Sequence, residues 1–320
     1  MRKRAVSAVR VSTMSSTTHF EGVSAAVRKH EAASSFRQRY WLFVLPATLV
    51  IGGVIVFPWV FTVWMALHEW KVTGDHAFVG LANFVNLFSD QRFIESIWRT
   101  FWFTLLATLI PVILGVWAAL VFHRSFPFRG LLRTVFVMPM MATPVAIALV
   151  WTMMFHPQLG VLNYLLSLVG LPPFSWIYDP ATVIPTLVLV EVWHWTPLVM
   201  LIVLGGLAGL PTDPYEAALI DGASSWQMFR YITWPLILPY VMIALVIRTI
   251  DSLKVFDTIA VISQGGPGTA SETLNYFLYL QAFQFYNVGY ASAVVLVFFV
   301  IIIALSLLLL YVRQQTKWME

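Results

Sequence analysis

One polar segment governs the interpretation of this sequence: Asp213-Pro-Tyr-Glu-Ala-Ala-Leu-Ile-Asp-Gly-Ala-Ser-Ser-Trp-Gln-Met-Phe-Arg-Tyr-Ile-Thr-Trp-Pro235. It separates two long apolar segments and contains residues that start and stop helices. Asp213 suits an N-cap, Pro214 the first helical position, and Glu216 the third, where its carboxylate reaches back to the cap. Gly222 permits the positive φ that ends a helix. The segment therefore predicts a helix from Asp213 to just before Gly222.

A second short helix is expected after the glycine, and Pro235 should end it. The residues that recur there at helical spacing are Ala223, Trp226, Phe229 and Arg230. The resulting helix-turn-helix would expose three small residues around its turn, namely Ala217, Ala218 and Ala223. Such a shape fits the groove of a partner protein. An ordinary amphipathic connector explains the pattern equally well.

The composition of the 320-residue chain is that of a membrane protein. Hydrophobic residues make up 59% and charged residues only 11%, where soluble domains have about 25% charged residues. A spanning helix needs about 20 mainly apolar residues, because only a helix satisfies its own backbone groups in hydrocarbon. The segments that meet this requirement are Trp41–Leu67, Phe101–Phe122, Leu132–Phe155, Val183–Leu207, Leu236–Ile262 and Tyr290–Val312.

The distribution of Lys and Arg predicts that both termini are cytoplasmic. Basic residues flank the spans on one side, which carries Arg124, Arg129, Arg133, Arg230, Arg313 and Lys317. On the other side, the loops 157–180 and 264–287 contain no Lys or Arg. Residues 1–38 are polar and basic, and we expect a disordered cytoplasmic tail. Residues 39–95 would form the first span and an external loop, and 313–320 a second cytoplasmic tail.

Ionisable residues inside the spans mark candidate functional positions, because they are costly in lipid. The fourth span contains Glu191-Val-Trp-His-Trp-Thr-Pro197, in which the proline is expected to break the helix and free carbonyl groups for a ligand. The fifth span contains Arg248, Asp251, Lys254 and Asp257 at three-residue steps. These four residues either neutralise one another in pairs, 248 with 251 and 254 with 257, or form a polar stripe along a translocation path.

A sugar or polyol would suit the polar and aromatic residues of the fourth span. Trp193 and Trp195 offer flat faces for a sugar ring, and Glu191 and His194 offer hydrogen-bonding groups for hydroxyls. Tryptophan also anchors helices at the membrane interface. Either role is open for each of the two indoles.

The run Glu216-Ala-Ala-Leu-Ile-Asp-Gly-Ala223, with Ile232, Pro235 and Pro239, resembles the signature loop of binding-protein-dependent ABC importer permeases. Trp234 departs from that pattern, which usually has leucine. Further motifs are similar to those of the carbohydrate branch, especially of the maltose and glycerol-phosphate subunit with a Gly-Gly-Pro stretch. These motifs are Phe78-Val-Gly-Leu-Ala-Asn-Phe84, Pro139 with Pro144 and Trp151, Gly160 with Asn163, Val255-Phe-Asp-Thr-Ile-Ala-Val-Ile-Ser-Gln-Gly-Gly-Pro-Gly268, Glu272-Thr-Leu274 and Ala282-Phe283.

The resemblance implies an all-α integral membrane protein of six transmembrane helices, with a type-1 permease core over 96–312, in a bacterial inner membrane. It implies a second homologous permease, two ATP-binding subunits that hold ATP and magnesium, and an external solute-binding protein as partners, with no cofactor on this chain. The residues that would couple to the ATPase are Glu216, Ala217, Ala218, Asp221, Gly222 and Ala223. The residues that would line the substrate pathway are Glu191, His194, Trp195, Leu198, Arg248, Asp251, Ser252 and Val255; most differ in type from those of the maltose-type relatives.

Other function classes fit the sequence less well. A secondary transporter usually shows internal repeats with matched broken helices, and only one such break and no clear repeat is evident. An enzyme is not indicated, because the histidines are not paired at metal-ligand spacing and no Gly-x-Ser-x-Gly motif occurs. A Gly-x-x-x-x-Gly-Lys-Ser/Thr motif is also missing, and the chain has no cysteine. We therefore expect a transport subunit for a sugar, a polyol or another small polar solute.

Overall fold

The computed structural model describes residues 17–70, 74 and 76–316, which divide between Phe61 and Thr62 into two units. The α-helices are α1 Thr17–Ala66, α2 Ala82–Ser89, α3 Gln91–His123, α4 Arg129–Val137, α5 Pro144–Met154, α6 Val161–Leu168, α7 Val183–Ala208, α8 Asp213–Ile220, α9 Ser225–Met228, α10 Trp234–Leu253, α11 Leu274–Tyr279 and α12 Val288–Thr316. A 3-10 helix, η1, covers Met138–Met141, and π-helices cover η2 Phe229–Thr233, η3 Ile259–Ser263 and η4 Leu280–Gln284. Two short strands, β1 His68–Glu69 and β2 Ala77–Phe78, pair antiparallel.

The first unit consists of the larger part of α1. Between Phe43 and Phe61 no described side chain of this helix is buried within the chain, as expected for an apolar helix whose surroundings are lipid or another protein. The helix begins at Thr17, so residues 17–38 differ from the disordered tail expected there. That stretch contains four alanines, two arginines and two glutamates, which favour helix. Residues 1–16 lie outside the described residues.

Five helices in the described part of the chain are long and apolar enough to cross a membrane, which supports the predicted all-α architecture. They are Phe43–Ala66, Gln91–His123, Val183–Ala208, Ser225–Leu253 and Val288–Tyr311. The predicted span over 132–155 is instead two helical segments, Arg129–Met141 and Pro144–Met154, which meet at 98°. Thr143 is extended, with ψ at 142°, because a residue before proline is disfavoured in the helical region. Counting this bent pair as one span gives six.

The fifth predicted span is also wrong at both ends. Helix α10 ends at Leu253 and not at Ile262. The Lys254 carbonyl accepts a hydrogen bond from Asn275 Nδ2 at 2.7 Å, which replaces the donor that another helical turn would supply. At the other end Pro235 does not stop the helix, which runs continuously from Ser225. The π-helical turn at 229–233 provides the local adjustment that a proline in a continuing helix requires.

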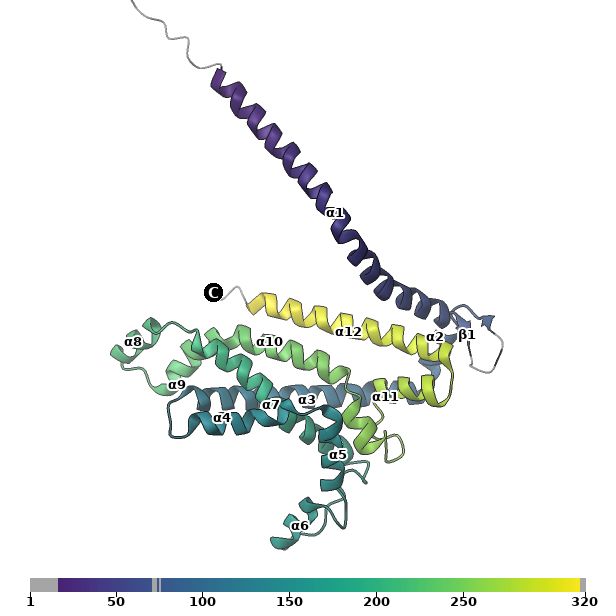
Figure 1. Ribbon diagram of the computed structural model, residues 1–320. Coiled ribbons are helices and arrows are strands. Elements are labelled where there is room, and N and C mark those ends of the chain that lie inside the picture. The colour runs from purple at the N-terminus through teal and green to yellow at the C-terminus, as the bar shows by residue number, and fades with distance from the viewer. Residues whose placement is uncertain (1–16, 71–73, 75, 317–320) are drawn as a thin grey trace, which may run out of the picture. The chain divides into compact units, whose positions relative to one another are not determined.

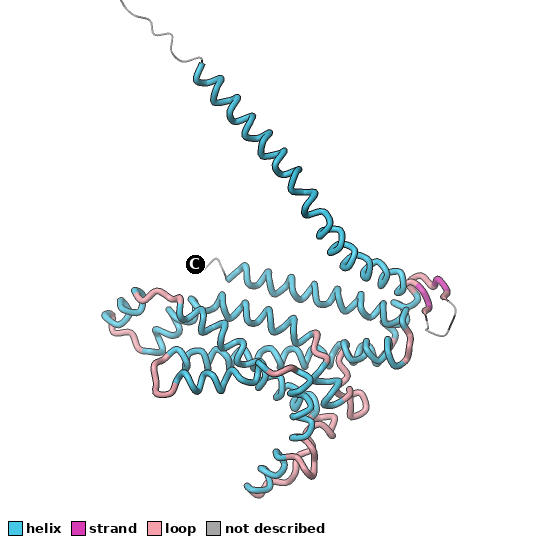
Figure 2. Tube along the Cα trace, viewed as in Figure 1, coloured by secondary structure: helices cyan, strands magenta, loops and turns pink. Residues whose placement is uncertain are grey.

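In the second unit α3, α7, α10 and α12 lie side by side, whereas α5 turns away from them and α6 lies beyond it (Figure 1). Figure 2 shows the β1–β2 hairpin at one end of this bundle and the α8–α9 turn at the other. The long helix α3 packs along α7, and α10 packs against both. The three helices share an apolar core that includes Val116, Met200 and Ile237. This bundle positions the polar residues described below.

Helix α7 runs without interruption through Pro197, so the predicted break is wrong. Because proline has no amide hydrogen, the Trp193 carbonyl lacks the helical hydrogen bond that residue 197 would otherwise donate. The Thr196 hydroxyl donates to the Val192 carbonyl at 2.6 Å. Close packing on both sides of α7 supports the helix across the proline, since Val199 and Met200 are fully buried.

Two neighbouring glycines of α7 provide a test of the α7–α10 contact. A Cβ atom on Gly206 would lie 2.5 Å from the Tyr240 ring, whereas one on Gly205 would meet nothing within 4 Å. Gly206→Ala should therefore lower the free energy of unfolding by about 1–3 kcal/mol through overpacking. Gly205→Ala should leave it unchanged or raise it by up to about 1 kcal/mol, because alanine favours helix. Thermal unfolding of both variants in detergent measures the difference, and equal melting temperatures would contradict the packing described here.

Candidate functional site

A buried ion pair joins α7 to α10 in the middle of the bundle. Arg248 Nη2 lies 3.2 Å from Glu191 Oε2, and the two residues are 1% and 4% exposed. Two charges at this depth are tolerated because each neutralises the other and forms further hydrogen bonds. The predicted pairing of Arg248 with Asp251 is wrong, since within the described residues Arg248 forms its ion pair with Glu191.

Three neighbouring groups complete this polar network. Thr258 donates its hydroxyl to Glu191 Oε1 at 2.8 Å. Arg248 Nη2 also donates to Ser252 Oγ at 2.9 Å and to the Ala107 carbonyl of α3 at 3.2 Å. The network thus connects α3, α7, α10 and the segment that follows α10. Sequence reasoning did not identify Thr258, although a buried carboxylate in a span requires such a donor.

His194 and Trp195 lie beside this ion pair. The Arg248 guanidinium is 5.0 Å from the centre of the Trp195 ring, a cation–π arrangement. The His194 and Trp195 rings are 4.5 Å apart, and His194 is only 2% exposed. His194 Nε2 and Arg248 Nε have no hydrogen-bond partner among the described residues. The predicted pathway residues Glu191, His194 and Arg248 are therefore buried inside the subunit.

Of the other predicted pathway residues, all but Ser252 are at least partly accessible. Asp251 is exposed, whereas Trp195, Leu198 and Val255 are half-buried and Ser252 is buried. Lys254, next to this group, is exposed and caps the end of α10. Of the four residues of the predicted polar stripe, Arg248 is buried, Asp251 and Lys254 are exposed and Asp257 is half-buried. The stripe is therefore not one continuous accessible surface. No ion pair joins Lys254 to Asp257 in the described part of the chain.

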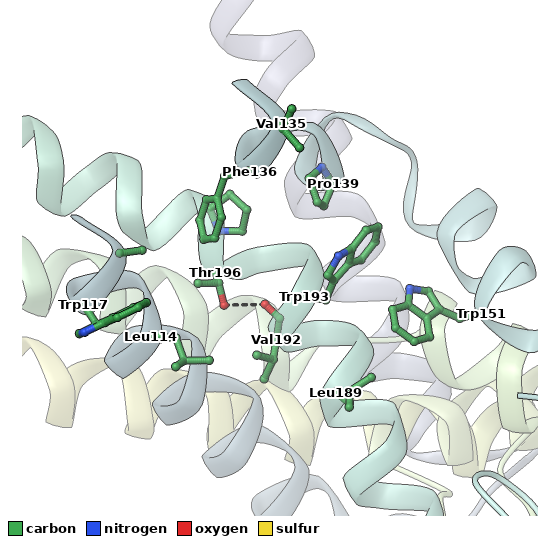
Figure 3. A pocket seen from close by; sticks show the side chains of 12 residues that line it. Leu114, Trp117, Val135, Phe136, Pro139, Trp151, Leu189, Val192, Trp193 and Thr196 are labelled. Carbon is green, nitrogen blue, oxygen red and sulfur yellow. Dashed lines mark hydrogen bonds between the residues drawn. The ribbon is translucent and has the colours of Figure 1, made fainter. Parts of the chain in front are cut away.

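Trp193 lines an apolar cavity of about 600 Å³. Figure 3 shows Trp193 and Trp151 on one side of this cavity and Trp117 on another. The Trp151 and Trp193 rings meet edge to face at 5.6 Å. A sugar ring needs hydroxyl partners as well as an aromatic face, and the lining is almost entirely apolar. Trp195 therefore suits a sugar better than Trp193 does.

The second candidate site is the helix pair α8–α9 at one end of the bundle. Gly222 has a φ of +74°. The Ala223 amide donates to the Ala218 carbonyl at 2.9 Å and the Gly222 amide to Leu219 at 3.2 Å, which is the Schellman pattern of a glycine-ended helix. Tyr215 donates its hydroxyl to Thr233 Oγ1 at 3.0 Å and so fastens α8 to η2. A helix, a glycine turn and a second helix are therefore present, but the second helix runs on through Pro235 and is not the short helix that was predicted.

The capping residues of this pair differ from the prediction. Helix α8 includes Asp213, and Thr212 occupies its N-cap without a side-chain bond, so Asp213 and Glu216 do not form a capping box. The Tyr215 and Glu216 amides donate to the Thr212 carbonyl at 2.9 and 3.1 Å, so the first helical hydrogen bonds end on Thr212 and place the cap one residue before Asp213. The capping box lies instead at the start of α9, where Ser224 and Gln227 bond each other's backbone amides. A serine followed three residues later by glutamine was the sequence signal for it.

The surface of the α8–α9 pair is unusually apolar for a polar connector. Leu219, Ile220 and Trp226 are 61%, 86% and 69% exposed. The predicted coupling residues are accessible as well, with Glu216, Ala217, Asp221 and Gly222 exposed and Ala218 and Ala223 half-buried. Clustered exposed apolar residues mark an interaction surface. The pair can therefore serve as a docking element.

The described part of the chain contains no group of three or more His, Cys, Asp or Glu side chains that could hold a metal ion. The polar sites described so far are the ion-pair network, the exposed end of α10 and the helix pair. Such sites can bind or guide a solute and a partner protein.

Comparison with known proteins places this geometry in a family. The family model described as "Binding-protein-dependent transport system inner membrane component" matches residues 111–318. The trehalose/maltose transport system permease protein of Thermococcus litoralis is 36% identical over 279 residues, which cover 86% of this chain and 93% of that protein. The sulfoquinovosyl glycerol transport system permease protein of Agrobacterium fabrum is 31% identical and covers 81% of this chain and 84% of its own.

Solved structures agree with this assignment. One chain from a bacterial alginate ABC transporter in complex with an alginate pentasaccharide-bound periplasmic protein has a TM-score of 0.76 and 25% identity, over 88% of this chain and 96% of its own. A second alginate importer structure has a TM-score of 0.77 at 23% identity, which supports the fold. The chain therefore belongs to the binding-protein-dependent transport system inner membrane components, and it is a multi-pass inner-membrane permease of the ABC importer type.

Proposed function

We propose that this permease carries a sugar or polyol, delivered by an external solute-binding protein, across the inner membrane. The observation that carries the proposal is the family match together with the accessible polar end of α10 inside a bundle of apolar helices. Relatives named for trehalose/maltose and for sulfoquinovosyl glycerol transport support a carbohydrate substrate. A different small polar solute remains the alternative.

The proposed complex contains a second homologous permease and two ATP-binding subunits, which hold ATP and magnesium; this chain binds no cofactor. The exposed residues of α8–α9 support a docking role toward an ATP-binding subunit. Substrate would enter a cavity between the two permeases and leave it on the inner side. The alginate transporter in complex with its periplasmic protein is a precedent for the binding-protein partner.

Both termini and the α8–α9 pair are placed on the cytoplasmic side in this proposal. The α8–α9 pair and the loop between α3 and α4 lie at the same end of the bundle (Figure 1). Arg124, Arg129 and Arg230 lie at that end, and positive residues favour the cytoplasmic side of a membrane. Labelling of single cysteines from one side tests this directly, because the chain has no cysteine of its own.

The substrate class is tested best on the cognate solute-binding protein. A panel of sugars, polyols and amino acids is added, and thermal stabilisation of that protein is measured. Stabilisation by a sugar or polyol supports the proposal. Stabilisation by an amino acid alone would contradict it.

Asp251 is the proposed pathway residue that contacts substrate. Asp251 is the exposed charged residue of α10, whose other charged residue, Arg248, is buried. A hydrogen bond to a charged acceptor is worth about 1.5–3 kcal/mol. Asp251→Ala should therefore raise the KM for uptake about tenfold or more, with the protein still present in the membrane. The matched control is Asp179→Asn, in the loop before α7, which keeps an oxygen acceptor for the Ala181 amide. If Asp251→Ala and the control have the same uptake kinetics, Asp251 is not part of the substrate pathway.

A further inference from the structure

The segment 264–275, which we name the strap, lies between η3 and the first turn of α11, at the end of the bundle opposite α8–α9 (Figure 1). It is tightly folded. The Ser271 hydroxyl lies 2.6 Å from the Gly266 carbonyl and 2.8 Å from Ser263 Oγ. Ser271, Glu272 and Thr273 are at most 1% exposed. The strap is therefore an ordered element and not a loose loop.

A half-buried ion pair, with Glu272 buried and Arg92 partly exposed, fastens the strap to the start of α3. Arg92 Nε and Nη2 donate to Glu272 Oε1 and Oε2 at 2.8 and 2.6 Å, a bidentate arrangement. Such forks are among the strongest charge-assisted hydrogen bonds, and they fix orientation as well as distance. The Arg92 guanidinium also lies 6.0 Å from the Phe277 ring and 5.8 Å from the Phe285 ring. Glu272 is thus held in one position by its partner.

Helix α3 makes two further contacts with the strap. The Leu274 amide donates to Thr100 Oγ1 at 2.7 Å, and Arg99 Nη2 donates to Thr269 Oγ1 at 3.1 Å. The α3 residues 92, 99 and 100 recur at a spacing that places them on one face of the helix. The strap is therefore fastened to α3 at three residues, 92, 99 and 100.

The other end of the strap holds the accessible end of α10. Asn275 Nδ2 donates to the Lys254 carbonyl at 2.7 Å. The Lys254 amide in turn donates to the Asp251 carbonyl at 3.1 Å. A helix end leaves carbonyls without helical donors, and Asn275 supplies one such donor. The position of Asp251 thus depends on a hydrogen bond from the strap.

We propose that Arg92, Glu272 and Asn275 are positioning residues that set the place of Asp251 relative to α3 through the strap. This inference rests on the proposed role of Asp251 in the substrate pathway. A rigid link of this kind carries a displacement at the strap directly to the end of α10, because both ends are held by specific hydrogen bonds. The three residues act through Asp251 and need not touch substrate themselves.

The first part of the test is hydrogen exchange on the purified full-length chain. Asn275→Leu removes the donor with little change in volume, and Glu272→Gln removes the charge that holds Arg92. In both variants, exchange in a peptide that covers 251–258 should be about tenfold faster, as expected for the loss of one hydrogen bond. Peptides from α7 should keep their wild-type protection. The matched control Gln284→Leu changes an exposed amide in η4 and should leave the 251–258 peptide unaffected.

The second part is the KM for uptake by the reconstituted complex. Both variants should raise KM severalfold, and Asn275→Gln, which keeps an amide donor, should restore it in part. Wild-type exchange in the 251–258 peptide, or faster exchange with a wild-type KM, would overturn the positioning role. If the wild-type complex takes up no sugar or polyol, the proposed function fails, whereas the exchange result still decides whether the strap holds α10.

Discussion

ATP-driven uptake should be abolished by Gly222→Trp, while the permease still folds and inserts. The φ of +74° at this position costs a residue other than glycine about 1–2 kcal/mol, which is too little to unfold the chain. A Cβ at Gly222 meets nothing within 4 Å in this subunit. Gly222 is also exposed, so we expect the indole to extend into solvent in the isolated permease and to clash with a partner that covers the turn. Uptake into proteoliposomes and co-purification of the ATP-binding subunits measure the two consequences.

The control for this prediction is Gly222→Asn. Asparagine tolerates the left-handed conformation better than other residues and has a small side chain. It should retain the α8–α9 turn and a substantial part of the uptake. If Gly222→Trp transports at the wild-type rate, the α8–α9 pair is an ordinary connector and the coupling role is lost.

Glu191→Ala should destabilise the permease by about 3–5 kcal/mol, because it leaves the Arg248 guanidinium buried without its counter-charge. Glu191→Gln keeps an acceptor for Thr258 and should cost less. The double change of Glu191 to Ala and Arg248 to Met removes both charges and should recover much of the loss. Unfolding in a denaturing detergent, followed on the purified protein, measures all three.

The matched comparison is Glu95→Ala on α3. Glu95 forms an ion pair with Arg99 four residues later, but its side chain is 44% exposed, and exposed pairs contribute about 0–1 kcal/mol. If Glu191→Ala is no less stable than Glu95→Ala, the Glu191–Arg248 pair does not support the bundle.

The membrane location and the helical secondary structure were predictable from the sequence. A long apolar segment in lipid forms a helix, because a helix satisfies all of its own backbone hydrogen bonds. The bend at Thr143 was not predicted, although Pro139 and Pro144 were noted, because a hydropathy pattern reports length and apolarity but not direction. The end of α10 was missed for a related reason. Asn275, which bonds the Lys254 carbonyl, is distant in sequence, and a local pattern carries no information about it.

The candidate site was predictable in its membership but not in its pairing. Glu191 and Arg248 were identified as costly intramembrane charges, which is a property of each residue alone. Their mutual contact depends on how α7 packs against α10, whereas spacing along one helix offered Asp251 as one possible partner of Arg248. Gly222 was predicted correctly to end α8, because the requirement for positive φ is local. The N-cap of α8 was misplaced by one residue, because the first helical hydrogen bonds end on the Thr212 carbonyl and not on Asp213.

The central claim is that this chain moves its substrate only when ATP is hydrolysed on other subunits. The most direct measurement is uptake of radiolabelled substrate into proteoliposomes that contain the complete complex and its solute-binding protein. The account predicts uptake with ATP and magnesium, and none when the ATP-binding subunits are omitted or when ATP is replaced by a non-hydrolysable analogue. Uptake driven by an ion gradient in liposomes that contain this chain without the ATP-binding subunits would contradict it.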